Sequence, residues 1–106
     1  MKKLCHIDEI DNHNSKGFDF HGQLLFAVRQ QDNVYVYRNS CPHLGIQLEW
    51  LPDRFLDVEG ELIQCSTHGA LFTIDEGLCI SGPCSGQSLQ AVDHEVRDQE
   101  IYVALD

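Results

Sequence analysis

Short apolar runs separated by turn residues extend through the whole sequence, and this pattern limits the fold more than any other feature. Turn-forming residues recur about every 8–12 positions, which is the spacing of small all-β domains. The runs between them are rich in Val, Leu, Ile, Phe and Tyr. No segment keeps a helical period of 3.6 over about ten residues. The sequence therefore predicts an all-β fold, with at most one turn of helix around residues 7–11.

The apolar runs predict strands joined mostly as hairpins. One strand is predicted over 16–22, and a hairpin of 24–29 with 34–38 turns at 31–33. A short strand over 62–64 precedes a hairpin of 70–74 with 78–80, and a last hairpin joins 90–96 to 101–105. Alternating Val and Tyr in residues 34–37 give the strongest β signal, and we expect this run to be a core strand. The period is lost from 39 to 52, and 81–88 reads as a loop rich in Gly, Ser and Pro.

Length and charge exclude several classes of protein. The chain has 106 residues, which fits one domain, so we expect residues 1–106 to form a single domain. Its 7 Lys and Arg against 17 Asp and Glu give a net charge of −10. Nucleic-acid binding needs cations that neutralise phosphates, and an anionic membrane also attracts basic segments. Neither partner is expected, whereas a basic protein partner is favoured.

The cysteines and the N-terminus bear on location. No apolar run approaches the ~20 residues of a membrane span, and the first residues do not resemble a signal peptide. We therefore expect a cytoplasmic protein without a membrane anchor. Five cysteines is an odd number, and cytosolic thiols stay reduced, so metal binding is favoured over a disulfide framework. Cys5, Cys79 and Cys84 are expected to be free thiols, with a Cys79–Cys84 disulfide as the alternative.

Two pairs of cysteine and histidine form the candidate metal site. Cys41-x-His43 and Cys65-x-x-His68 each follow a predicted strand and precede a glycine. Two cysteines and two histidines suit either one tetrahedral zinc ion or a 2Fe–2S cluster with both thiolates on one iron. Zinc sites of this ligand set usually pair Cys with Cys and His with His. Here each pair offers one of each, which favours a cluster held from both sides.

These pairs, together with the Gly82-Pro83 loop one hairpin later, resemble the Rieske iron–sulfur motif. The resemblance extends over residues 4–105. It implies an antiparallel β-sandwich of three small sheets, with the ligand loops and the proline loop forming a cluster-binding tip. It also implies one 2Fe–2S cluster per chain, with Cys41 and Cys65 on the buried iron and His43 and His68 on the outer iron.

At several positions within the motif, the chain resembles the soluble Rieske ferredoxins that serve ring-hydroxylating oxygenases rather than the respiratory Rieske proteins. The respiratory Rieske proteins carry an extra, disulfide-bonded cysteine in each pair, where this chain has Ile46 and Thr67. They also carry Ser and Tyr hydroxyls at the positions of Ala70 and Phe72. The small subunit of nitrite reductase shares the fold but typically lacks the ligands. Segment 44–64 is longer than expected for oxygenase ferredoxins, and its function is not evident from the sequence.

The sequence favours an electron carrier over an enzyme. It contains no dinucleotide-binding fingerprint, no nucleophile with a positioned base, and no mononuclear iron triad. The resemblance implies one-electron transfer from a flavin-dependent reductase to an oxygenase or similar acceptor. Two alternatives stay open, namely a redox-sensing regulatory protein and a zinc-stabilised binding module. The visible absorption spectrum separates the zinc module from the other two.

Overall fold

A computed structural model describes residues 1–42, 45–49, 51–66 and 69–105. Strands dominate these residues, as the sequence predicts, and the only helix described is a short 3-10 helix. None of the described residues belongs to a helix long and apolar enough to cross a membrane. The elements are β1 (Lys2–His6), η1 (Ile7–Glu9), β2 (Asn14–Phe20), β3 (Gln23–Gln30), β4 (Asn33–Arg38), β5 (Leu62–Gln64), β6 (Leu71–Thr73), β7 (Cys79–Ser81), β8 (His94–Arg97) and β9 (Glu100–Val103).

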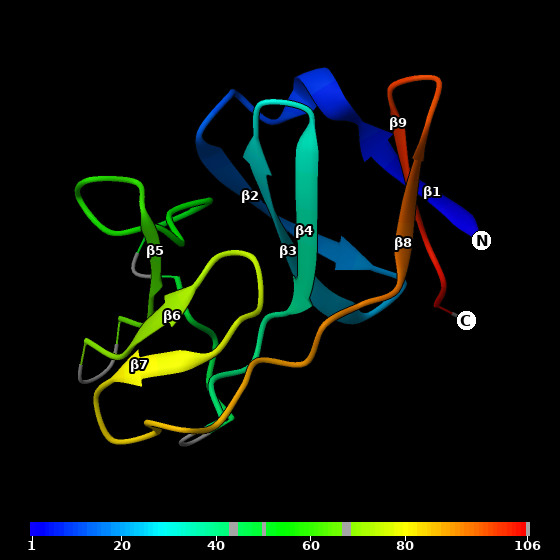
Figure 1. The fold of residues 1–106 in the computed structure, drawn as a ribbon. Helices are drawn as coiled ribbons and strands as arrows, with labels where there is room; N and C mark the ends of the chain where they lie inside the picture. The colour runs from blue at the N-terminus through cyan, green and yellow to red at the C-terminus, as the bar shows by residue number, and fades with distance from the viewer. Residues whose placement is uncertain (43–44, 50, 67–68, 106) are drawn as a thin grey trace.

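The strands form three small antiparallel sheets. Their orders are β1-β9-β8, β2-β3-β4 and β5-β6-β7. In Figure 1 the β2-β3-β4 sheet lies in the middle, with β1, β8, β9 and both chain ends on one side and β5, β6 and β7 on the other. The third sheet and the loops attached to it are therefore at the end of the molecule opposite the termini. This arrangement confirms the predicted sandwich of small sheets.

Strand β3 is buried on both of its faces, which explains its uninterrupted apolar run. Because side chains alternate across a strand, Leu25 and Ala27 lie on one face while Phe26 and Val28 lie on the other. All four are 0% exposed, and they belong to two different clusters of buried side chains. A strand covered on both faces needs no polar alternation. The middle sheet thus supplies one wall to each of two cores.

The two cores differ in the elements that they join. The terminal core joins the middle sheet to β1 and β9 and comprises Cys5, Ile7, Ile10, Phe20, Leu25, Ala27, Val34, Val36, Val92, Ile101 and Val103. The loop core joins the middle sheet to the third sheet and its loops and comprises Phe26, Val28, Tyr37, Cys41, Leu48, Phe55, Ile63, Cys65, Ala70, Phe72, Ile74, Cys79, Cys84 and Leu89. Four of the five cysteines lie in the loop core.

Several predicted strand boundaries were wrong, and two of the differences have a clear cause. β2 ends at Phe20 rather than at residue 22, because His21 and Gly22 form a two-residue turn with φ of 53° and 86°. β8 begins at His94 rather than at residue 90, because residues 90–92 bond instead to β4. Gln90 O accepts from Arg38 N at 2.9 Å, and Val92 N donates to Val36 O at 2.9 Å. The strand signal in 90–92 is genuine, but its partner is a different sheet.

The last hairpin also turns more tightly than expected. Arg97 pairs with Glu100, so the turn consists of two residues, Asp98 and Gln99, rather than four. Both have positive φ, 50° and 65°. That is the type I′ geometry, which matches the twist of hairpin strands but is usually built from Asn or Gly. Asp and Gln at these two positions therefore did not reveal that the turn has only two residues.

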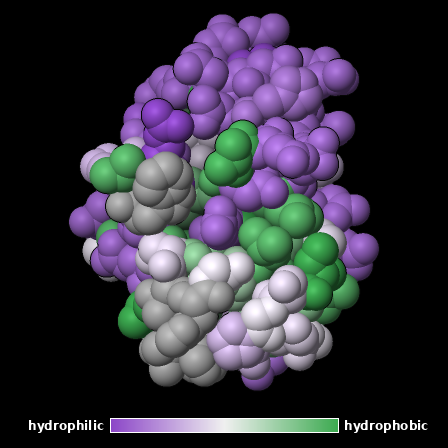
Figure 2. All heavy atoms as spheres, turned by 90° about the vertical axis from the view of Figure 1, so that its left-hand side faces the viewer, coloured by the Kyte–Doolittle hydropathy of each residue, from purple (hydrophilic) through white to green (hydrophobic). Residues whose placement is uncertain are grey.

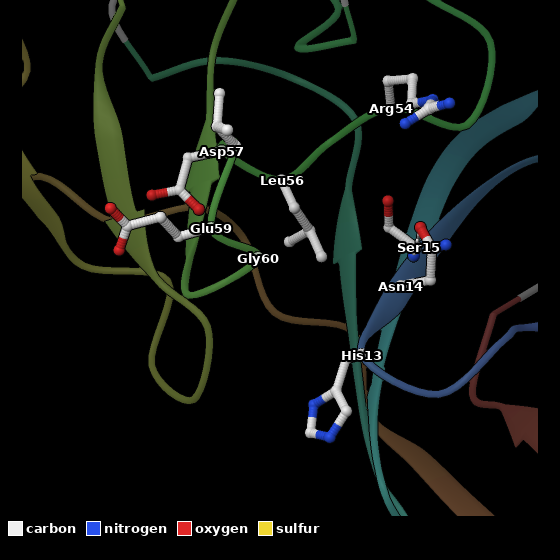
Figure 3. A pocket seen from close by; sticks show the side chains of 9 residues that line it. His13, Asn14, Ser15, Arg54, Leu56, Asp57, Glu59 and Gly60 are labelled. Atoms are coloured by element: carbon white, nitrogen blue, oxygen red, sulfur yellow. Dashed lines mark hydrogen bonds between the residues drawn. The ribbon is translucent and has the colours of Figure 1, made fainter.

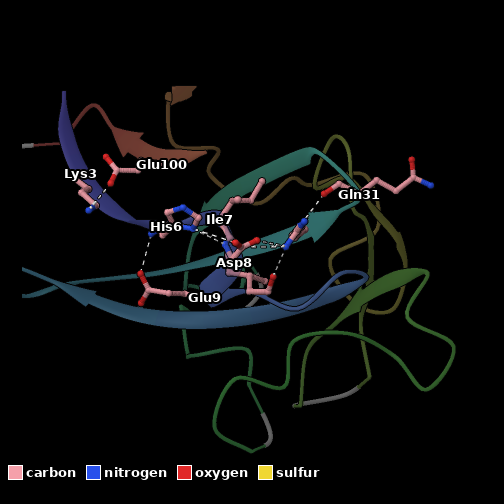
Figure 4. Close-up of polar contacts among 9 residues, drawn as sticks. Lys3, His6, Ile7, Asp8, Glu9, Gln31 and Glu100 are labelled. Carbon is pink, nitrogen blue, oxygen red and sulfur yellow. Dashed lines mark hydrogen bonds and ion pairs between the residues drawn. The ribbon is translucent and has the colours of Figure 1, made fainter. Parts of the chain in front are cut away.

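The expected turn after β1 is the 3-10 helix η1, which is capped at its start by its own neighbours. His6 N donates to Glu9 Oε2 at 2.8 Å, and Asp8 N donates to His6 Nδ1 at 3.1 Å. Figure 4 shows the polar contacts of His6, Asp8 and Glu9 at the start of η1. Just after η1, the Arg29 guanidinium donates to Ile10 O at 3.0 Å, which ties this segment to β3. These bonds satisfy backbone groups that such a short helix leaves open. They anchor the N-terminal segment to the middle sheet.

Candidate metal centre

Cys41 and Cys65 begin two loops that are closed by the same backbone hydrogen bond. Cys41 N donates to Ile46 O at 2.7 Å, and Cys65 N donates to Ala70 O at 2.8 Å. In both loops the donor and the acceptor are five residues apart. Each hydrogen bond holds its cysteine at the base of a tight loop. The paired motifs of the sequence therefore correspond to paired structures.

A glycine occupies the fourth position after the cysteine in both loops. Gly45 has a φ of 71° and Gly69 has a φ of 61°. This left-handed conformation strains a residue with a Cβ but not glycine. The glycine that follows each Cys–His pair is thus required by the way its loop closes. Predicted ligands His43 and His68 lie inside these loops, outside the described residues.

The two cysteine thiols lie in the same core. Cys41 is 3% exposed and Cys65 is 0% exposed, and both are members of the loop core. All five cysteines are described, and none of them forms a disulfide. Buried thiolates are the soft ligands that iron–sulfur clusters use. The donor chemistry at these two positions therefore fits a [2Fe–2S] cluster.

The proline loop, residues 81–88, packs against the second of these loops. A Cβ built on Gly82 would lie 2.9 Å from Ala70 Cα, so glycine allows the two backbones to touch. On the other side, Ser66 N donates to Leu48 O at 2.8 Å and joins the second loop to the segment after the first. In Figure 1 the described parts of these three loops lie on the same side of the molecule as the third sheet. The tip that the resemblance implies is therefore present in the backbone.

Replacing Gly82 by alanine is expected to loosen this tip. Alanine at 82 meets the Ala70 backbone and also a φ of +105°, whereas Gly86, with a φ of +89°, has no atom within 4 Å of its Cβ position. Both substitutions carry the left-handed strain of about 1–2 kcal/mol, and only Gly82→Ala adds overpacking of about 1–3 kcal/mol. Thermal unfolding and iron content of the two variants measure the difference. Equal losses in both would show that the contact with Ala70 is unimportant.

Asn39 supports the first loop, and the sequence analysis missed it. Its side chain is buried, with Oδ1 accepting from Leu48 N at 2.8 Å and Nδ2 donating to Glu49 Oε1 at 2.9 Å. These bonds close the chain around Cys41. The available signal was an Asn just after a strand and before the Cys–His pair, where side-chain to backbone bonds are common.

The remaining histidines lie on other parts of the fold. His6 is in β1, His13 and His21 are next to β2, and His94 is in β8. His94 is half-buried, with Nδ1 2.9 Å from Val92 O and Nε2 2.8 Å from Val34 O. It therefore links the first sheet to the middle sheet. Its function is structural at this position.

A polar surface pocket lies beside β2, away from the cysteine loops. Figure 3 shows it between the start of β2 and the segment that leads to Gly60. The lining residues are His13, Asn14, Ser15, Arg54, Leu56, Asp57, Val58, Glu59 and Gly60. Neither Cys41 nor Cys65, the two predicted ligands that the structure describes, is among them. The pocket is therefore separate from the candidate metal centre.

Three small antiparallel sheets with two matched cysteine loops define a metal-cluster β-sandwich, and the comparisons identify its family. Residues 1–101 match the Rieske [2Fe-2S] domain. The chain is 35% identical over 80 residues to ferredoxin CarAc of Metapseudomonas resinovorans, covering 76% of this chain and 69% of CarAc. The protein belongs to the Rieske [2Fe–2S] family.

Solved structures of ferredoxins agree with this assignment. The ferredoxin of carbazole 1,9a-dioxygenase from Nocardioides aromaticivorans IC177 has a TM-score of 0.79 and 26% identity, with 100% of both chains covered. A chain in a complex of reduced oxygenase and oxidized ferredoxin of carbazole 1,9a-dioxygenase has a TM-score of 0.78 and 28% identity, covering 96% of this chain and 99% of that chain. The predicted Rieske fold is confirmed.

Family membership also decides between the two metals. A Rieske domain of ferredoxin type carries one [2Fe–2S] cluster per chain, so the cluster is favoured over zinc. The protein is an electron carrier, as ferredoxins of this family are, and not itself a catalyst of substrate oxidation. The prediction of an electron carrier is thereby confirmed.

Proposed function

We propose that the protein carries single electrons from a flavin-dependent reductase to a terminal oxygenase. The observation that carries this proposal is the match, over the full length of both chains, to the ferredoxin of a dioxygenase. A complex of oxygenase and ferredoxin from such a system contains a second similar chain. We further propose that residues 1–106 form one Rieske domain that works in the cytoplasm.

We propose Cys41, His43, Cys65 and His68 as the ligands of the cluster. Support comes from the burial of both cysteines in the loop core and from the matched loops that begin at them. The bound cluster accepts and releases one electron. Around it, the loop core excludes water from the thiolates. The backbone bonds of the two loops hold both cysteines in position.

The face that bears the third sheet is the proposed docking surface. Figure 2 shows hydrophobic side chains gathered over the lower half of this face and hydrophilic ones over the upper half. Exposed apolar residues on adjoining segments include Ile46 in the first loop and Ile80 on β7, which are 36% and 51% exposed. Leu44 and Trp50, two further apolar residues of the same stretch of sequence, lie outside the described residues. An apolar surface on a strongly acidic protein suits brief contact with a basic partner.

Electron delivery is expected to slow when salt is added. Raising the ionic strength from about 0.01 M to 0.15 M shortens the Debye length from about 30 Å to about 8 Å and screens the charge of −10. Since electrostatic steering speeds association by a factor of about 10 or more, the bimolecular rate constant should fall by a similar factor. Stopped-flow reduction by the flavin reductase, followed by reoxidation by the oxygenase, measures it.

Ile46→Lys tests the docking face in the same assay. The matched control is Val96→Lys on β8, because Val96 is 40% exposed and belongs to the sheet at the opposite end. Both variants add the same charge, but only Ile46→Lys should slow delivery to the oxygenase. Equal rates for the two variants would exclude this face as the docking surface. Reduction by the reductase without delivery to any oxygenase would refute the proposed function and favour a regulatory protein.

A further inference from the structure

Two cysteines that the electron-transfer function does not use are in direct contact. Cys79 on β7 and Cys84 in the proline loop are 2% and 0% exposed. The Sγ of Cys84 donates to the Sγ of Cys79 across 2.8 Å, and Cys79 Sγ donates to Ser81 O at 3.2 Å. Both thiols are therefore satisfied in the reduced form, through weak hydrogen bonds.

The backbone holds these two sulfurs together. Cys79 N donates to Gln87 O at 2.8 Å, and Cys79 O accepts from Gly86 N at 3.1 Å. Gln87 N in turn donates to Cys84 O at 2.9 Å. The proline loop thus forms hydrogen bonds with both the N–H and the C=O group of Cys79 on β7. Since a disulfide needs about 2.05 Å between sulfurs, closing the bridge requires the two Sγ atoms to approach by only about 0.8 Å.

We propose that Cys79 and Cys84 form a reversible dithiol–disulfide couple, a redox-modification site separate from the cluster. The oxidant is a small disulfide such as oxidised glutathione. One cysteine thiolate attacks it and releases one glutathione thiolate, and the second cysteine then attacks the mixed disulfide and releases the other. The two cysteine protons pass to the two glutathione thiolates. The protein gains one S–S bond and loses two electrons, which reduce one oxidised glutathione to two glutathione molecules.

The position of the pair connects it to the candidate metal centre. Gly82, two residues before Cys84, packs on Ala70 at the end of the second cysteine loop. Cys79 and Cys84 also share the loop core with Cys41 and Cys65. A bridge from β7 to the proline loop would lock the proline loop against the strand. The couple would thus restrict the motion of one of the three loops of the tip, in a step that does not involve cluster electron transfer.

Reaction at this pair is expected to be slow. Burial, together with the neighbouring Cys79 sulfur, raises the pKa of the Cys84 thiol to about 12. The thiolate is the form that attacks a disulfide, and it is scarce near neutral pH. Oxidation and reduction of the pair therefore need long incubations. Once formed, the dithiol or the disulfide persists, because thiol–disulfide exchange is slow. The test is accordingly an equilibrium measurement.

The chain offers a direct readout of this couple. Cleavage after Glu76 and Glu95 releases residues 77–95, whose only cysteines are Cys79 and Cys84. The holoprotein is equilibrated anaerobically in glutathione buffers of increasing oxidised fraction, then denatured and alkylated with iodoacetamide before cleavage and mass measurement. We expect this peptide to change from two alkyl groups to none, while the visible absorption of the cluster is retained.

The other cysteines provide internal controls. Cys5 is likewise buried, burial raises its pKa to about 11, and it is the only cysteine in residues 1–9. It should keep its alkyl group throughout, because no thiol partner lies beside it in the described structure. Residues 10–49 and 62–76 report oxidation of the Cys41 and Cys65 thiols separately, while the visible absorption reports the cluster itself.

Three outcomes would overturn the proposal. The 77–95 peptide could keep both alkyl groups in the most oxidising buffer, or one cysteine could carry a glutathione adduct without closing the bridge. The bridge could also form only in parallel with loss of cluster absorption, which would make it a product of damage. The variant Cys84→Ala should leave Cys79 unable to form the intramolecular bond. The proposal is supported if neither Cys79 nor Cys84 is alkylated after incubation under oxidising conditions in which the holoprotein keeps its cluster absorption.

Discussion

Replacing Cys41 or Cys65 by serine is expected to abolish [2Fe–2S] binding. A serine hydroxyl is a poor substitute for a soft thiolate, and both positions are buried, where no solvent ligand can take over. Iron and acid-labile sulfide should fall from two of each per chain to near zero. The red-brown visible absorption should disappear with them. Iron analysis, sulfide analysis and the visible spectrum of protein produced in iron-replete cells measure the loss.

Cys5→Ser is the matched control for this experiment. Cys5 is 3% exposed, like Cys41, but it belongs to the terminal core at the other end of the molecule. The control variant should therefore keep its cluster, although burying a hydroxyl costs stability there. Cluster retention in Cys65→Ser, or equal loss in Cys5→Ser, would contradict the proposed ligands. One zinc ion and no iron in the wild-type protein would contradict the cluster itself.

The cysteine variants should also lose stability. Because a metal site rarely exists in the unfolded chain, the free energy of metal binding adds to the free energy of folding. Here ligation would join two loops that the hydrogen bond from Ser66 N to Leu48 O already connects in the described structure. We expect the loss to affect the loop core more than the terminal core. Hydrogen exchange of β5 and β6 against β1 and β9 would show the difference.

The fold was predictable from the sequence wherever neighbouring strands pair. The hairpin of β3 with β4 and that of β6 with β7 follow from local apolar runs and their turns. Residues 90–92 show the limit of this reasoning, since their hydrogen bonds go to β4, which is distant in the sequence. An apolar run reports that a segment is buried in a sheet, but it does not report which sheet.

Of the candidate metal centre, the sequence predicted the proposed ligands, because they lie within recognisable Cys–His motifs. Cys41 and Cys65 follow from their pairing with histidines, and the structure places both in one core. The supporting contacts are not encoded in any motif. Phe55, in the long segment 44–64, stacks on Phe26 with ring centroids 4.4 Å apart, and Asp53 Oδ1 accepts from Gly17 N at 2.8 Å. These contacts show that the long segment covers the middle sheet, which residue types alone do not reveal.

The reduction potential of the cluster is expected to lie near the low end of the Rieske range, at about −150 to −50 mV. Hydroxyl donors beside cluster sulfurs stabilise the added electron, and the buried positions Ala70 and Phe72 carry none. The charge of −10 also opposes reduction. Ala70 O accepts from Cys65 N at 2.8 Å, so residue 70 is held close to a proposed ligand. Redox titration of the visible or EPR signal measures the potential.

Ala70→Ser and Phe72→Tyr should each raise this potential. A hydrogen bond to a charged acceptor contributes about 1.5–3 kcal/mol, which corresponds to roughly 60–130 mV for one electron. The matched controls are Ala27→Ser and Phe20→Tyr, which make the same changes at buried positions of the terminal core. Since they lie away from the cysteine loops, they should change stability but not the potential. A wild-type potential above about +150 mV, or equal shifts in the controls, would contradict the dependence on hydroxyl donors at positions 70 and 72.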